Sequence, residues 1–451
     1  MTTRLPADTT SSNVSSSGPI VVIGGGIAGL VAAARLGQLN VPVTLVDKAT
    51  HVGGRAITRN RDGFLFNLGP HALYRRGRLR STLHQLGVAV HGSVPRTNGY
   101  FALCDGRRHT LPVGFASLLG TGLLTLGGKL EMARLLSRLA AVDARAVRGQ
   151  PLASWLDAHV ADCRVRAVVE MLVRLTTFTH DSERQSAGAA IEQLQLATAG
   201  NVLFLDGGWQ TIVDGLRAAL GRYGVRVRVG AAATTLERDG RNVVGVRLAD
   251  GTSIPAAAVV IAAPPSEVDR LTGVTRLTDR LSPVGFATLD VALRRLPNRK
   301  ALAVFGVDEP LYLSVHSAAA RLAPAGGALV HASRYLAPGE KAGRDVERRL
   351  ESLLDRFQPG WRDQVASKHY LPSLVVTHAQ LLASTAGARP SPRIDECSNV
   401  FIAGDWVGAH GQLSDAAAAS GEEAAALAVA TASGGPDRGH DVENRSEVAV
   451  A

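Results

Sequence analysis

Three glycines and one acid near the start of the chain have the spacing that holds a pyrophosphate and a ribose. The stretch Val-Val-Ile-Gly-Gly-Gly-Ile-Ala-Gly-Leu places Gly24, Gly26 and Gly29 in a G-x-G-x-x-G frame directly after a predicted strand. Gly24 permits a tight turn, Gly26 lets the main chain approach a pyrophosphate, and Gly29 lets the next helix pack closely on the strand. Asp47 follows a second strand, where its carboxylate can accept hydrogen bonds from a ribose diol.

The helix between these two strands provides the electrostatics of the motif. Its N-terminus, where Ile27 and Ala28 lie, presents free N–H groups and a partial positive charge to a phosphate. Lys48 follows the acid and completes the predicted set of nucleotide contacts. Because the glycines occur in the required order of strand, turn, helix and strand, the sequence predicts a dinucleotide site at this end of the chain.

Similar elements recur further along the chain. The residues Asp-Gly-Gly-Trp open a predicted helix within 205–220, and alternating β patterns lead to a buried strand at 259–263. Another buried strand, at 399–403, ends at Gly-Asp and is followed by an Ala-rich helix at 414–432. The intervening chain is predicted to form helices at 78–86, 111–147, 152–159, 165–177 and 345–357 and strands at 284–296, 312–316 and 328–335.

This order predicts two interleaved domains, which a single contiguous nicotinamide-binding domain would not produce. The dinucleotide-binding domain is expected to comprise 18–80, 201–265 and 395–432, and the substrate-binding domain 81–200 and 266–394. The polar segments 1–17 and 433–451 are expected to be a disordered N-terminus and a flexible tail.

Composition narrows the range of partners. The net charge of +10 comes almost wholly from arginines that are not interleaved with aromatic residues, which argues against nucleic acid and leaves contact with an anionic membrane surface open. Three scattered cysteines form neither a disulfide framework nor a metal-ligand pattern, so no metal and a reducing cytoplasm are expected. No run of 18 apolar residues occurs, so no membrane-spanning helix is predicted.

Four blocks of residues together resemble the FAD-dependent superfamily of amine oxidases, phytoene desaturases and protoporphyrinogen oxidases. The blocks are the first glycine motif with its acid, Gly53-Gly54-Arg55 with Gly69-Pro70, the Asp-Gly-Gly-Trp turn, and residues 399–405 with 416–421. The resemblance implies an α/β fold, in which a Rossmann-like FAD-binding domain of glutathione-reductase type, with a mixed sheet, is interleaved with an α+β substrate domain. It also implies a flavin-dependent dehydrogenase or oxidase.

The resemblance assigns further residues to the cofactor. Gly54 and Arg55 would approach the pyrophosphate, where the guanidinium can offset phosphate charge. The last helix would point its N-terminus at the pyrimidine edge of the flavin and stabilise negative charge there. The remaining contacts implied are Gly69, Pro70 and His71 beside the ring, Val229 at the adenine, Gly404 and Asp405 at the phosphate and ribityl groups, and Leu413, Ser414 and Ala416 at the last helix.

The implied reaction removes a hydride from a small hydrophobic substrate, after which an external acceptor, oxygen or a quinone, reoxidises the flavin. Amine oxidases of the superfamily often carry a lysine near the flavin, but the corresponding stretch 283–290 has none. We therefore favour C–C desaturation of the phytoene-desaturase kind, with amine oxidation as the alternative. A redox-inert FAD-binding or membrane-associated protein and a flavin-dependent isomerase also remain open. Cys397 is too close to Gly404 for a covalent flavin link, so noncovalent FAD is expected.

His71 and Tyr74 follow the Gly-Pro turn and are the candidate catalytic residues. A histidine can accept a proton near neutral pH, although a hydrogen-bonded structural histidine is the plainer interpretation. The glycine-interrupted helices at 111–139 would line a tunnel for a lipophilic substrate, contact a membrane surface through Arg134 and Arg138, or simply form a core helix pair.

Overall fold

The N-terminal glycines lie in a βαβ unit that has the predicted order. Strand β1 (Ile20–Ile23) leads into helix α1 (Ile27–Gln38), and β2 (Val43–Val46) returns parallel to β1. All eight strand residues are buried, as a strand covered on both faces requires. The computed structural model describes residues 18–112, 114–273 and 276–433.

The first sheet collects strands from three distant parts of the chain. Its order is β10-β2-β1-β14-β21-β20, and β10, β2, β1, β14 and β21 run parallel, while β20 pairs antiparallel with β21. The strands not yet given are β10 (Arg226–Arg228), β14 (Ala258–Ile261), β20 (Arg393–Ile394) and β21 (Cys397–Ile402). A small antiparallel sheet of β11 (Ala233–Asp239), β12 (Asn242–Leu248) and β13 (Ser253–Pro255) packs beside it. The fold class predicted from the sequence, a Rossmann-like α/β domain with a mixed sheet, is confirmed.

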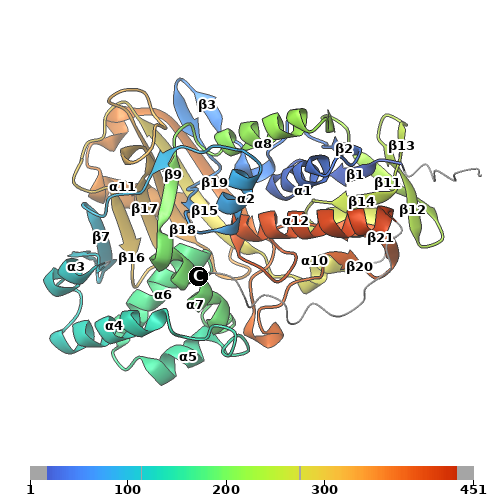
Figure 1. Cartoon of the computed structure of the whole chain (residues 1–451). Helices are drawn as coiled ribbons and strands as arrows, with labels where there is room; N and C mark the ends of the chain where they lie inside the picture. Colours follow the sequence, from blue (N-terminus) through green and yellow to red (C-terminus); the bar gives the residue numbers. More distant parts are fainter. Residues whose placement is uncertain (1–17, 113, 274–275, 434–451) are drawn as a thin grey trace, which may run out of the picture.

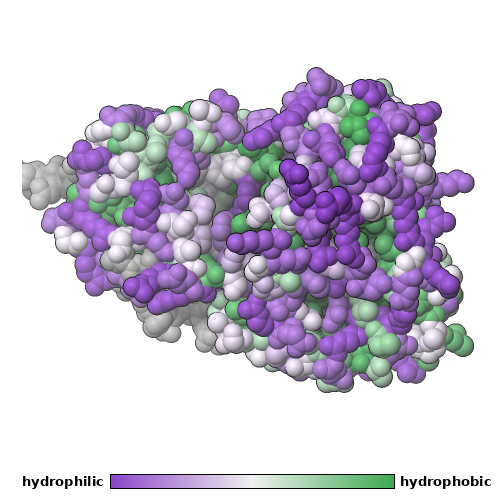
Figure 2. Space-filling view, turned by 180° about the vertical axis from the view of Figure 1, so that it is seen from behind, coloured by the Kyte–Doolittle hydropathy of each residue, from purple (hydrophilic) through white to green (hydrophobic). Residues whose placement is uncertain are grey.

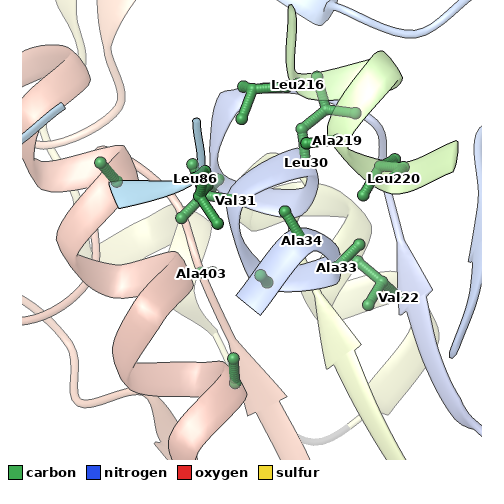
Figure 3. Packing of buried hydrophobic residues seen from close by; sticks show 14 of the residues in the cluster. Val22, Leu30, Val31, Ala33, Ala34, Leu86, Leu216, Ala219, Leu220 and Ala403 are labelled. Atoms are coloured by element: carbon green, nitrogen blue, oxygen red, sulfur yellow. The ribbon is translucent and has the colours of Figure 1, made fainter. Parts of the chain in front are cut away.

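Small residues let helix α1 lie close to its neighbours. Around it pack α12 (Leu413–Ala432), α8 (Gln210–Arg222) and α2 (Arg78–Gln85), seen together at the right of Figure 1. Figure 3 shows Leu216, Ala219 and Leu220 of α8 leaning onto the face of α1 that carries Leu30. A Cβ at Gly421 of α12 would lie 2.4 Å from the main-chain oxygen of Ala28 in α1, so only glycine permits this spacing between the two helices. The packing fixes the N-termini of both helices relative to each other.

The second sheet has seven strands in the order β19-β15-β18-β17-β16-β7-β8. Helix α11 (Arg344–Phe357) covers one face, and helices of the segment 115–200 cover the other, at the lower left of Figure 1. The strands are β7 (Tyr100–Cys104), β8 (Arg107–Thr110), β15 (Val284–Leu293), β16 (Ala303–Gly306), β17 (Leu311–Val315), β18 (Ala328–Tyr335) and β19 (Val365–Thr377). The helices are α3 (Phe115–Gly120), α4 (Leu126–Leu139), α5 (Leu152–His159), α6 (Cys163–Thr177) and α7 (Ala187–Gly200).

Side chains of β15 alternate between these two faces, as the two-residue period of a strand requires. Leu289, Val291 and Leu293 pack under α11, whereas Phe286 faces the helical layer. Thr288 and Asp290 share the register of Phe286, so the strand also carries polar groups on the side away from α11. This face borders the cavity described below.

The short elements connect the two sheets. They are β3 (Arg59–Arg61) with β4 (Phe64–Phe66), the small sheet of β5 (Leu73–Tyr74), β9 (Val202–Leu205) and β6 (Gly92–Ser93), helices α9 (Pro265–Thr272) and α10 (Leu277–Arg280), and the 3-10 turns η1 (Gly54–Ala56), η2 (His316–Ala318), η3 (Trp361–Gln364) and η4 (Ala383–Thr385).

The helical segment predicted at 111–147 with glycine interruptions is two helices with a break between them, as expected, but α4 ends at Leu139, so the predicted extent was too long. Thr121 is extended at the end of α3, and the Thr125 side chain accepts a hydrogen bond from the Gly128 N–H to cap the start of α4. A new helix capped by the Thr125 hydroxyl is more favourable here than one helix that continues through the flanking glycines. The sequence interpretation missed the 13-residue strand β19. Buried and exposed positions do not alternate regularly along this strand, so its sequence lacks the two-residue period that predicts a strand.

Candidate functional site

A cavity of about 960 Å³ opens between the first sheet and the second. Most of the residues predicted to bind the cofactor line it, although they come from distant parts of the sequence. Those lining it are Gly24, Gly26, Ile27, Ala28, Asp47, Lys48, Gly54, Arg55, Pro70, His71, Tyr74, Gly404, Asp405, Leu413 and Ser414. Gly29, Gly69, Val229 and Ala416 do not line it.

The glycine turn leaves room for a phosphate. Gly24 has φ +103°, and a Cβ there would lie 2.3 Å from the main-chain oxygen of Ala262. A Cβ on Gly26, by contrast, would meet nothing within 4 Å, so its space is open to a ligand. No side chain caps the N-terminus of α1, which leaves its N–H groups available to an anion. Gly29 acts in packing, because a Cβ there would meet the Gly24 oxygen at 1.9 Å.

The second glycine pair closes the cradle from the other side. Gly54 has φ +54°, and its Cβ would lie 3.3 Å from the Cα of Gly26. The two turns therefore lie directly against each other, and both line the cavity. Trp209, from the Asp-Gly-Gly-Trp turn, also lines the cavity, and its buried indole N–H has no partner among the described residues. An open backbone cradle and a free donor fit a dinucleotide.

Two main-chain donors fix the Asp47 carboxylate at the cavity wall. Its Oδ2 accepts from the Gly25 N–H at 2.6 Å and its Oδ1 from the Ala49 N–H at 2.7 Å. Beyond it, Val229 lies one residue past β10, is 45% exposed and is absent from the cavity wall. The chain instead meets the cavity at residues 231–234, which the sequence interpretation missed because it followed the valine alternation past the end of the strand.

Asp405 lies buried at the end of β21. Arg55 Nη2 is 3.0 Å from its Oδ2, and His378 Nδ1 is 3.4 Å from its Oδ1. Burial alone would raise the pKa of Asp405, but the Arg55 guanidinium and His378 outweigh burial and hold it below the ordinary value. The group is therefore an ionised acceptor suited to a hydroxyl donor. His378 was not singled out from the sequence.

The N-terminus of helix α12 lies at the cavity wall and is uncapped. No side chain caps it, and Leu413 at its start has φ +54°, a conformation that costs a non-glycine residue energy. Gly411 before it also has a positive φ, and its Cβ would lie 3.0 Å from the Asp415 side chain. The strained turn directs free N–H groups at the cavity, where Leu413 and Ser414 form part of the wall.

The two candidate catalytic residues differ in what they offer. His71 Nδ1 lies 3.1 Å from the Gly69 carbonyl oxygen, so Nδ1 carries the proton and Nε2 is the acceptor. Burial lowers the pKa of His71, which keeps the imidazole neutral. Tyr74 donates its hydroxyl proton to the Thr176 carbonyl at 3.0 Å, and burial raises its pKa well above the ordinary value. Tyr74 is thus a structural donor, and His71 is a neutral imidazole held by the main chain at Gly69 and Arg55.

The far end of the cavity is aromatic. Edge-to-face contacts join Phe178, Phe286 and Tyr335, with ring centroids 5.1 to 6.0 Å apart. Tyr100, Phe305 and Tyr312 continue the wall through further contacts of 5.7 Å. Sequence analysis did not find this lining, because its members lie on five strands and a helix end and share no local motif.

The parallel sheet, two glycine turns and closing helix define a dinucleotide-binding protein whose cavity continues to the second sheet. Residues 27–429 match the family described as flavin containing amine oxidoreductase. The chain therefore belongs to this family of FAD-dependent oxidoreductases, as the sequence resemblance implied, and the residues around the cavity fit that cofactor.

Curated relatives within the family have different activities. The chain is 26% identical over 286 residues to coproporphyrinogen III oxidase of Bacillus subtilis, a match covering 54% of this chain and 59% of that protein. It is 27% identical over 288 residues to the neurosporene-forming phytoene desaturase of Rhodobacter capsulatus, covering 55% and 53%. The matches thus span a little over half the length of these relatives.

Solved structures share the fold across nearly the whole chain. An oxidoreductase from Methanosarcina mazei superposes with a TM-score of 0.72 at 18% identity, covering 90% of this chain and 99% of that one. Wild-type putrescine oxidase bound to putrescine gives 0.70 at 17% identity, covering 92% and 99%. At these identities the likeness establishes the fold alone.

Proposed function

We propose that the protein removes a hydride from a neutral, hydrophobic substrate and that the reaction is a C–C desaturation. The aromatic end of the cavity supports this proposal. Among the described residues that line the cavity, the acids are Asp47, Glu267 and Asp405 and the one lysine is Lys48, and all four belong to the nucleotide or phosphate region. A cationic amine would find aromatic faces there but no carboxylate. A polycarboxylate such as coproporphyrinogen would find no lysine or arginine at the aromatic end, because the two arginines that line the cavity are already paired, Arg55 with Asp405 and Arg270 with Glu267.

The protein's part in the reaction is binding and orientation. FAD supplies the hydride acceptor when it is bound. The turns at Gly26 and Gly54 would hold the phosphates, Asp47 the ribose, Asp405 a ribityl hydroxyl, and the N-terminus of α12 the pyrimidine edge. Phe178, Phe286 and the tyrosines exclude water and press the substrate toward the ring. Cys397 is buried in β21 and away from the cavity, which supports noncovalent attachment.

Anaerobic flavin bleaching tests the proposed reaction. Purified protein reconstituted with FAD is mixed, without oxygen, with linear polyenes in detergent, with primary amines or diamines, and with coproporphyrinogen. We expect polyenes alone to bleach the flavin band, with new conjugated double bonds in the product. Bleaching by amines would replace the proposal with the alternative, and a polyene isomer formed without net flavin reduction would establish an isomerase. A flavin that no substrate reduces would support a redox-inert protein.

A hydrophobic substrate also bears on membrane contact, and we propose that α3 and α4 dock on an anionic lipid surface. Phe115 and Leu126 are 79% and 83% exposed, and Leu130 is 53% exposed. Leu126, Leu130, Arg134 and Arg138 follow one another at four-residue spacing, so apolar and basic side chains share one helix face. Figure 2 shows hydrophobic residues reaching the surface at its lower right corner, where this helical layer lies when Figure 1 is turned. No helix among the described residues is long and apolar enough to cross a membrane.

Vesicle co-sedimentation tests this docking. Vesicles containing phosphatidylserine should pull down the wild type, and the double variant Leu126→Glu/Leu130→Glu should bind at least about 10-fold more weakly, because two apolar contacts are lost and negative charge is added. Val244→Glu is the matched control, since Val244 is 49% exposed on β12. Equal binding by the double variant and the control would contradict the proposed surface, and so would equal binding to uncharged phosphatidylcholine vesicles.

A further inference from the structure

A buried carboxylate lies beneath the turn that carries His71. Asp290 of β15 is 1% exposed, and its Oδ1 accepts hydrogen bonds from His331 Nδ1 at 2.7 Å and Thr288 Oγ1 at 2.8 Å. Its Oδ2 accepts from the Gly69 N–H at 3.3 Å. His331 is paired directly opposite Asp290 on β18, so the sheet register itself sets this contact. A fully buried carboxylate requires such donors.

Two buried histidine rings continue from this carboxylate. His331 must carry its proton on Nδ1 to donate to Asp290, which leaves Nε2 as an acceptor. His316 lies with its ring centroid 4.7 Å from that of His331, at 72°. His316 Nε2 is 3.2 Å from the Tyr312 hydroxyl, and when the hydroxyl donates its proton there, His316 keeps its own proton on Nδ1.

The two remaining nitrogens complement each other. His316 Nδ1 and His331 Nε2 are both buried and have no hydrogen-bond partner among the described residues. One is a donor, the other is an acceptor, and their rings are in contact. A hydrogen bond between them would complete a chain from Tyr312 through His316 and His331 to Asp290. Unpartnered buried nitrogens are costly, so a functional reason for keeping them is warranted.

This chain begins at the wall of the cavity. Tyr312 and His316 line its aromatic end, whereas His331 and Asp290 lie behind them. Phe204 stacks on His316 with ring centroids 3.9 Å apart and covers the outer imidazole. The far end of the chain touches the Gly69 turn, next to the space assigned to the flavin. This row of hydrogen-bonding side chains, from Tyr312 to Asp290, therefore connects the substrate region with a buried carboxylate.

We propose that Tyr312, His316, His331 and Asp290 form the path that takes up the proton released by the substrate, an inference that rests on the proposed desaturation. Hydride transfer to FAD removes one hydrogen and two electrons from one substrate carbon. The neighbouring C–H bond then breaks, its electron pair becomes the new π bond, and its hydrogen leaves as a proton. The oxidised flavin is the oxidant, and oxygen or a quinone later restores it.

The proton is distributed without leaving a charge unpaired. Tyr312 accepts the substrate proton as it passes its own to His316 Nε2, and His316 then releases the Nδ1 proton to His331 Nε2. His331 becomes an imidazolium bonded to the Asp290 carboxylate, so positive and negative charge end side by side. Burial, together with His331 and His71, lowers the pKa of His316 well below its ordinary value, which keeps that imidazole neutral and ready to accept. A substrate carbon that has just lost hydride has a strongly acidic neighbouring C–H, so a weak base suffices.

Single-turnover kinetics test the path. His316→Gln and Asp290→Asn should slow anaerobic flavin reduction by a polyene by about 100-fold, the usual contribution of a positioned acid or base, while FAD affinity stays within about twofold. His109→Gln on β8, outside the cavity, is the matched control. Imidazole added to His316→Gly should restore part of the rate, which a merely structural role would not allow. Wild-type rates in His316→Gln and Asp290→Asn would overturn the path.

A second measurement does not depend on turnover. The wild-type apoprotein should show a strongly downfield-shifted proton resonance for His331 Nδ1–H, and His331→Gln and Asp290→Asn should each abolish it, while His109→Gln keeps it. Absence of this resonance from the wild type would overturn the path by itself. A wild-type flavin that no substrate reduces would contradict the proposed function, whereas a reduced flavin with unaffected variants would contradict the path alone.

Discussion

Gly26→Ala is expected to leave the apoprotein folded and to weaken FAD binding by about 100-fold, or about 2.8 kcal/mol. Gly26 has φ −73°, which alanine adopts freely, and a Cβ there meets no atom within 4 Å. The free energy of unfolding of the apoprotein should therefore fall by no more than about 1 kcal/mol. The methyl group instead occupies the space through which a pyrophosphate would approach the main chain. Flavin fluorescence titration and thermal unfolding of the apoprotein measure the two quantities separately.

Two further glycines serve as controls for this variant. Gly24→Ala places a Cβ 2.3 Å from the Ala262 carbonyl at a positive φ, so it should destabilise the apoprotein itself by about 3 kcal/mol. Gly221→Ala in α8 also meets nothing within 4 Å, and it should leave FAD binding unchanged. Wild-type FAD affinity in Gly26→Ala would show that the open cradle is not the phosphate site.

Asp415→Asn is expected to stabilise the protein at pH 8 and to have little effect at pH 4. Asp415 lies in the first turn of α12, where burial raises its pKa to about 6 although the Leu79 N–H donates to its Oδ1. Its Oδ2 has no partner among the described residues. Because the folded-state pKa is raised, the folded protein favours the protonated acid. The stability that protonated Asp415 contributes is fully present below its unfolded-state pKa, near 4, and is lost as the pH rises through its folded-state pKa of about 6.

The expected difference at pH 8 is on the order of 3 kcal/mol, since about two pKa units separate the folded and unfolded states. Urea unfolding of wild type and Asp415→Asn across pH 4–8, at equal flavin content, gives the curve. Asp279→Asn on exposed α10 controls for the loss of one negative charge. Parallel curves for wild type and Asp415→Asn would show that Asp415 ionises as easily in the folded protein as in the unfolded one.

The sequence predicted the nucleotide-binding half well because each of its parts is local. A glycine frame, a strand and a helix lie within about 30 residues, and their roles depend on backbone conformation that few residue types allow. Gly24 and Gly54 have the positive φ that their turns require, and the last buried strand ends at Ile402, just before the predicted turn at Gly404 and Asp405. Val229, predicted to contact the adenine through its main chain, lies one residue past the strand, which ends at Arg228, and does not line the cavity.

By itself, then, the sequence determined the fold class, the cofactor family and most of the glycines and acids that line the cavity. It could not place Trp209 against His71, His378 beside Asp405, or the aromatic lining around Tyr335. These groups meet only when two sheets pack, because side chains on separate strands carry no common period along the chain. The Asp290–His331 contact is likewise set by the antiparallel register of β15 and β18, which long-range pairing alone decides.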